Sequence, residues 1–106
     1  MRVLRDECVP KRLRSELAAH FVRTVAEAGW AGLTNGRLRA AAATDFDCLL
    51  TVDRNLQYQQ RVGDLPLSVL VIAATDNKFE TLRRGMDGVR AVLETLPPRE
   101  LAVVRI

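Results

Sequence analysis

The sequence is poor in the residues that build metal clusters, disulfide frameworks and aromatic surfaces. Its 106 residues include two cysteines, one histidine, one tryptophan, one tyrosine and three phenylalanines. Cys8 and Cys48 lie too far apart in the sequence to form a metal-type cysteine pair, and we expect both to be reduced thiols. The single histidine, His20, has no serine or cysteine partner with which to build a catalytic triad. The few aromatic residues are not interleaved with basic ones, so the sequence shows no base-stacking surface for nucleic acids.

Long apolar segments are also missing. No apolar run approaches the roughly 20 residues that cross a bilayer, and the charged start of the chain lacks a signal-peptide core. We therefore expect a cytoplasmic protein without a membrane anchor. Sixteen basic and thirteen acidic residues give a net charge of +3, which is compatible with nucleic-acid binding but does not require it. The length and the 48% hydrophobic content are typical of one soluble domain spanning residues 1–106.

Short apolar segments alternate with helical patterns along the chain. This alternation predicts an α/β fold, a three-layer α/β/α sandwich around a mostly parallel sheet of about five strands. The expected strands cover residues 2–6, 21–25, 48–52, 67–73 and 101–106. The expected helices cover residues 11–19, 37–43, 54–62 and 78–96.

Acidic residues follow three of the expected strands. Asp6 and Glu7 follow the first strand, Asp53 the third and Asp76 the fourth. Because the carboxyl ends of parallel strands share one edge, where open sheets bind their ligands, we expect these carboxylates to converge. Hard oxygen ligands of this kind suit Mg²⁺ or Mn²⁺, and a bound ion of that type can activate water against a phosphodiester.

Each of these acids also has a structural interpretation. Asp6 and Asp53 could instead cap the helices that follow them, and Glu7 could face solvent. Asp76 could form a turn with Asn77. Two further acids, Asp45 and Asp47, precede the third strand, and we expect them at the opposite edge of the sheet.

Four segments together carry a resemblance to a known family: LRDECVP, AGWAGLTNGRL, FDCLLTVDRNLQYQQ and ATDNKFETL. They are similar to the short PIN-like domains of bacteria and archaea, relatives of PIN-domain toxin ribonucleases. The resemblance implies an α/β/α fold, a Mg²⁺ or Mn²⁺ site and cleavage of single-stranded RNA. It matches Asp6 and Asp53 to the metal-binding acids, with Glu7 and Asp76 as helpers. It also implies a cognate antitoxin as partner protein.

The chain departs from the family at Asn35-Gly36-Arg37-Leu38, where relatives often carry an acid and this sequence has Arg37. A second interpretation is therefore a non-catalytic PIN-like module that binds protein or RNA, with Arg37 occupying the place of the cation. A third is a receiver- or flavodoxin-like domain, although the lysine expected late in a receiver has no counterpart. The candidates for RNA contact, each also readable as solvated surface, are Arg12, Arg37, Arg54 and Asn55. Trp30 either anchors its loop or contributes to a dimer or partner surface.

Overall fold

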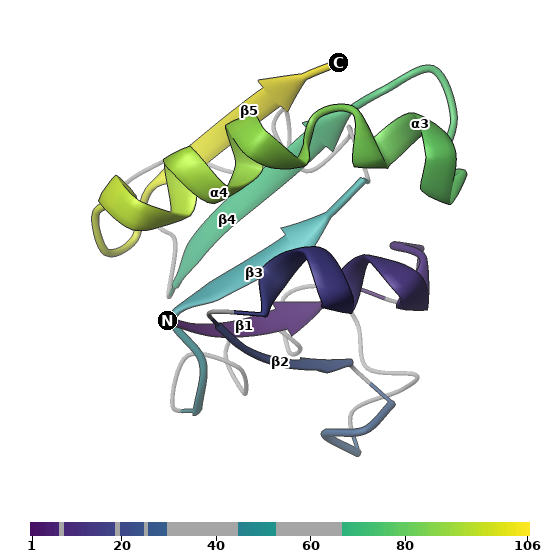
Figure 1. The fold of residues 1–106 in the computed structure, drawn as a ribbon. Helices are drawn as coiled ribbons and strands as arrows, with labels where there is room; N and C mark the ends of the chain where they lie inside the picture. The colour runs from purple at the N-terminus through teal and green to yellow at the C-terminus, as the bar shows by residue number, and fades with distance from the viewer. Residues whose placement is uncertain (7, 19, 25, 30–44, 53–66) are drawn as a thin grey trace.

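The computed structural model describes residues 1–6, 8–18, 20–24, 26–29, 45–52 and 67–106. Five strands form one sheet in the order β2-β1-β3-β4-β5, and all four pairings are parallel (Figure 1). The elements are β1 (Arg2–Arg5), the 3₁₀ helix η1 (Lys11–Leu17), β2 (Phe21–Thr24), β3 (Cys48–Thr51), β4 (Ser68–Ala73), α3 (Phe79–Arg83), α4 (Met86–Thr95) and β5 (Leu101–Arg105).

The expected α/β fold with a parallel five-stranded sheet is confirmed, and each strand begins and ends within one residue of its predicted bounds. The chain passes from β1 outward to β2 and then returns to the other side of β1 as β3. The order of the strands therefore reverses between β1 and β3. In doubly wound sheets, a ligand binds at the carboxyl ends of the strands beside this reversal.

The three central strands are buried on both faces, as expected for continuous apolar runs in a parallel sheet. Alternate residues enter two separate core clusters. In β4, Leu70 and Ile72 belong to the cluster that contains the helices, whereas Val69 and Val71 belong to the cluster on the other face. The period of two along each strand thus divides one hydrophobic sequence into two cores.

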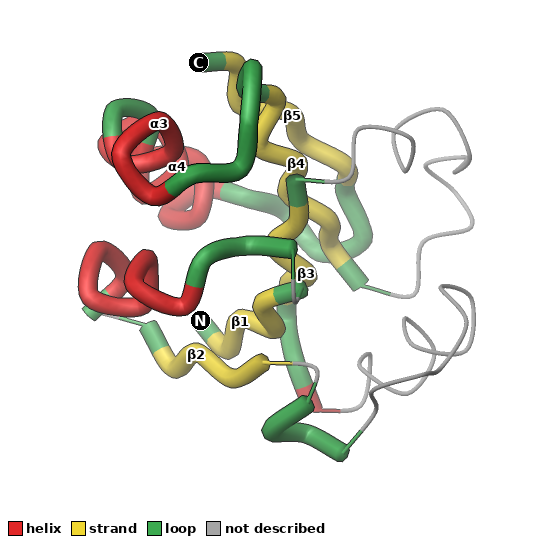
Figure 2. Tube along the Cα trace, turned by 90° about the vertical axis from the view of Figure 1, so that its right-hand side faces the viewer, coloured by secondary structure: helices red, strands yellow, loops and turns green. Residues whose placement is uncertain are grey.

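The described helices η1, α3 and α4 all lie on one face of the sheet (Figure 2). The segments 37–43 and 54–62, for which we expected helices, lie outside the described residues. The α/β sheet is therefore established, and the third layer stays a prediction. None of the helices in the described part of the chain is long and apolar enough to cross a membrane.

The long helix predicted over 78–96 is wrong in one respect: it is divided into α3 and α4 at Gly85. Its apolar residues still face the core, because Leu82, Met86 and Leu93 are buried. A β-carbon at Gly85 would lie 2.4 Å from Cγ1 of the terminal Ile106, so the glycine makes room for the end of the chain. Glycine also disfavours a helix interior, which favours a break at this residue.

The helix expected over 11–19 forms as the seven-residue 3₁₀ helix η1. Leu13 and Leu17 are buried, whereas Ala18, which follows η1, is exposed. The hydroxyl of Ser15 donates to the carbonyl of Arg12, 3.0 Å away, a local bond that competes with regular α-helical pairing. The carboxylate of Glu16 pairs with Arg83 and Arg90, which joins η1 to α3 and α4.

Candidate functional site

Asp6 lies at the carboxyl end of β1, directly beside the reversal of strand order. Its backbone N–H donates to the carbonyl of Leu50, 2.9 Å away, so the pairing with β3 continues through this residue. Its carboxylate Oδ2 accepts a hydrogen bond of 2.9 Å from the hydroxyl of Thr51, the fully buried last residue of β3. The alternative that Asp6 caps the next helix is wrong, because η1 has no side-chain cap.

Two further residues join this site, which we call the carboxyl-edge cluster: Asp6, Cys8, Thr51 and Asn77. The sulfur of Cys8 lies 3.6 Å from the Thr51 hydroxyl, and the Asn77 amide donates to the Cys8 carbonyl over 3.2 Å. Asn77 belongs to the loop between β4 and α3, so the cluster joins three strand ends. Within this cluster the Thr51 hydroxyl orients the half-buried carboxylate of Asp6.

Asp76 lies in the loop at the same edge of the sheet, and its carboxylate is engaged at the start of α3. It accepts the backbone N–H of Lys78 over 2.9 Å. This bond, with help from Thr81 and the nearby charges of Lys78 and Arg84, lowers the pKa of Asp76. The turn expected for Asp76 is thus observed, whereas a metal-binding role for Asp76 stays a prediction.

The remaining predicted site residues fall into two groups. Arg12 is described, and it is exposed on η1. The others lie outside the described residues: Glu7, Arg37, Asp53, Arg54 and Asn55. Trp30 lies outside them as well. Within the described ranges, no group of three histidine, cysteine or acidic side chains is arranged to hold a metal ion.

Arg5 is a further residue of this edge, and its burial was not predicted from the sequence, where it is one of the charged residues at the start of the chain. Its side chain is only 3% exposed and donates to the carbonyl of Val9. Arg5 follows Val3 by two residues on an interior strand, so it faces the helix-covered side of the sheet. The alternation of side chains between the two faces of a strand could have predicted the burial of Arg5. A buried cation next to Asp6 adds positive charge to the carboxyl edge.

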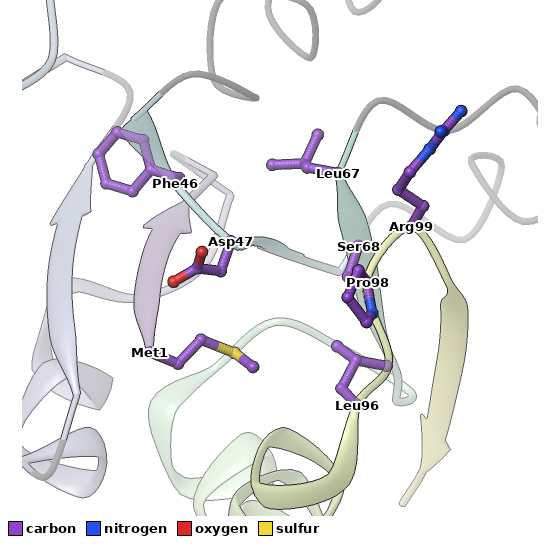
Figure 3. A pocket seen from close by; sticks show the side chains of 8 residues that line it. All are labelled: Met1, Phe46, Asp47, Leu67, Ser68, Leu96, Pro98 and Arg99. Atoms are coloured by element: carbon purple, nitrogen blue, oxygen red, sulfur yellow. The ribbon is translucent and has the colours of Figure 1, made fainter.

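The opposite, amino edge of the sheet carries a hollow of about 310 Å³, lined by Met1, Phe46, Asp47, Leu67, Ser68, Leu96, Pro98 and Arg99 (Figure 3). Two of its polar side chains, Asp47 and Ser68, form hydrogen bonds within the protein. Asp47 accepts the backbone N–H of Arg2 over 2.8 Å and pairs with its guanidinium, as the placement of Asp47 away from the acidic site predicted. The hydroxyl of Ser68 donates to the carbonyl of Pro97 over 2.6 Å. These contacts stabilise the fold.

His20 also lies at the amino edge, immediately before β2, and is therefore remote from Asp6. Partial burial and the nearby N-terminal amine lower the pKa of its imidazole.

The two thiols are expected to differ in reactivity. Burial raises the pKa of Cys48 to about 12, so this thiol should stay unmodified. Burial, opposed by hydrogen bonds from Val52 and Thr51 and reinforced by the charge of Asp6, raises the pKa of Cys8. Because only the thiolate reacts, Cys8 should react slowly with iodoacetamide at neutral pH, and Asp6→Asn should accelerate the reaction. Mass spectrometry across a pH series measures the rate of Cys8 alkylation in the natural protein and in Asp6→Asn. An equal rate in the two proteins would contradict the effect of the Asp6 charge on Cys8.

Taken together, the fold and the cluster define a parallel α/β protein with an oriented carboxylate where the strand order reverses. Comparison of the chain with protein-family models, curated proteins and solved structures finds no match.

Proposed function

We propose that this protein is a metal-dependent ribonuclease of the PIN-like type that acts on single-stranded RNA. The observation that supports the proposal is the position of Asp6, at the carboxyl end of β1 and bonded to the buried Thr51 at the end of β3. Carboxylates at this place in doubly wound sheets are well positioned for ligands, and a carboxylate oxygen suits Mg²⁺ or Mn²⁺.

The candidate ligands are carboxylate oxygens, which are the kind of donor that Mg²⁺ or Mn²⁺ prefers. Asp6 would bind it, and Thr51 would keep the carboxylate oriented. Asp53, which follows Thr51 by two residues in the sequence, would supply the second carboxylate, with Glu7 and Asp76 as further ligands. A bound ion of this class lowers the pKa of coordinated water and neutralises charge on a phosphodiester.

The wider setting belongs to the same proposal. By its resemblance to toxin ribonucleases, the protein would act in the cytoplasm and be held inactive by a cognate antitoxin protein. Its net charge of +3 is compatible with an RNA substrate.

Replacing Asp6 by asparagine is the direct test. The change keeps the shape of the side chain and removes its charge, so Mn²⁺ affinity measured by calorimetry should fall by at least roughly tenfold. Cleavage of single-stranded RNA should fall with it and should stop in EDTA. Asp45→Asn is the matched control, because it removes one exposed carboxylate at the opposite edge and should change neither property.

A second function is favoured by a specific feature, the arginine at position 37 in a segment where relatives often carry an acid. In this case the protein would bind RNA or protein without cutting it. Absence of Mn²⁺ binding in both the natural protein and Asp6→Asn would overturn the nuclease and leave this module. Cleavage that survives both EDTA and Asp53→Asn would also contradict the metal-dependent mechanism.

A further inference from the structure

A basic groove runs between η1 and α3. It has a volume of about 440 Å³ and is lined by Lys11, Arg12, Arg14, Ser15 and Phe79. Three of these side chains are cationic and one is aromatic, and among the described lining residues none carries a carboxylate. A groove of this size lies within the range of ligand sites, roughly 300–1,000 Å³. Its chemistry therefore favours an anionic ligand with a flat, unsaturated part.

Arg12 and Phe79 form a stack within the groove. The guanidinium carbon of Arg12 lies 4.2 Å from the centre of the Phe79 ring. Phe79 is half-buried and packs on the core, whereas Arg12 is exposed. The ring thus fixes a planar cation whose outer side is open to solvent. Nucleic-acid bases stack on both arginine planes and aromatic rings.

The groove is continuous with the carboxyl edge. Lys11 lines both this groove and a neighbouring hollow of about 400 Å³, which also contains Arg5 and Thr24 from the ends of β1 and β2. The acid in that hollow, Glu27, is paired with Arg14 and Arg23. Phe79 follows the loop whose Asn77 contacts Cys8 in the carboxyl-edge cluster. Positive charge therefore extends from the Arg12–Phe79 stack toward Asp6.

We propose that this groove binds single-stranded nucleic acid, with one base stacked on the outer face of the Arg12 guanidinium, which Phe79 supports, and an adjacent phosphate beside Lys11. The inference deepens the proposed function, since it names how a strand would reach Asp6, but the binding itself needs no metal ion. An acidic peptide would satisfy the cations without using the stack. The planar pair is thus the feature that selects a nucleobase.

The experiment uses the full chain with Asp6→Asn in EDTA, so that neither metal binding nor cleavage affects the result. Fluorescence anisotropy compares a labelled short oligouridine with an abasic strand of equal length and charge, and with duplex RNA. The oligouridine should bind on the order of tenfold more tightly than the abasic strand. Equal affinity for oligouridine and the abasic strand, or for oligouridine and the duplex, overturns the proposal.

Three variants separate stacking from charge. Arg12→Lys keeps the charge but loses the planar group, and Phe79→Leu keeps an apolar contact with the core but loses the ring. Each should weaken oligouridine binding on the order of fivefold and leave the abasic strand unaffected. Lys11→Gln should weaken both strands and reduce the salt slope by about one. Arg99→Gln at the amino edge is the charge control and should have no effect.

The outcomes separate this inference from the proposed function. Unchanged oligouridine binding in both Arg12→Lys and Phe79→Leu would overturn the groove even if Mn²⁺ binds at Asp6. Stacking-dependent binding in EDTA would support the groove even if Mn²⁺ does not bind. Circular dichroism and thermal melting confirm that each variant is folded, and Arg12→Lys, which alters an exposed residue, provides the test if Phe79→Leu fails to fold.

Discussion

Replacing Thr51 by valine is expected to weaken Mn²⁺ binding by roughly 10- to 100-fold, the usual effect of removing a group that orients a metal ligand. Thr51 is fully buried and donates to Asp6 over 2.9 Å. Valine keeps the branched shape at the end of β3 but has no hydroxyl, so the Asp6 carboxylate loses its support. Calorimetric titration of Mn²⁺ into each protein measures the change.

Thr51→Ser is the matched control, because it keeps the hydroxyl and removes only a methyl group. Its Mn²⁺ affinity should stay within a few-fold of the natural protein, while its stability should fall by about 1 kcal/mol. A valine variant that binds Mn²⁺ as tightly as the natural protein would show that the hydrogen bond has no role in metal binding. A serine variant as weak as the valine variant would assign the effect to packing instead.

Replacing Leu70 by alanine should lower the free energy of unfolding by about 2–5 kcal/mol. Leu70 is fully buried in β4 and belongs to the core cluster between the sheet and the helices, with Leu50, Met86 and Val89. Both neighbouring strands are hydrogen-bonded to β4, so the backbone has little freedom to close the cavity. Urea unfolding followed by circular dichroism measures the loss.

Leu101→Ala provides the comparison for this core prediction. This variant has the same leucine-to-alanine change, but Leu101 lies on the edge strand β5, where its side chain is only partly buried. Its cost should be smaller, about 1 kcal/mol, because less apolar surface returns to water. Equal losses in the two variants would contradict the assignment of β4 to the centre of the core.

The strands were the most predictable part of this molecule. Residues 67–73 form its most hydrophobic run, and β4 occupies Ser68–Ala73 with every residue buried. Burial on both faces allows no polar alternation, so a short continuous apolar run is the direct signature of a central parallel strand. Because the first strand was recognised from its apolar residues as well, Asp6 could be predicted to lie at the carboxyl edge of the sheet.

Contacts between distant residues could not be predicted in this way. The sequence indicated no stacking surface, since its few aromatic residues are not interleaved with basic ones. The fold nevertheless places Phe79 under Arg12, 67 positions earlier in the chain. Likewise, the fold places the side chain of Ile106 against Gly85, 21 positions earlier in the chain. Neither pairing has a local signal.

The sequence by itself determined the α/β class, the positions of the five strands and the edge at which Asp6 lies, because hydrophobic periodicity acts within a few neighbouring residues. The tertiary structure decided the strand order, the bond between Asp6 and Thr51, the burial of Arg5 and the Arg12–Phe79 stack. These features depend on which strands become neighbours and which side chains then share a face. The pairing of strands and side chains is determined by packing over the whole chain, so it cannot be predicted from any short segment alone.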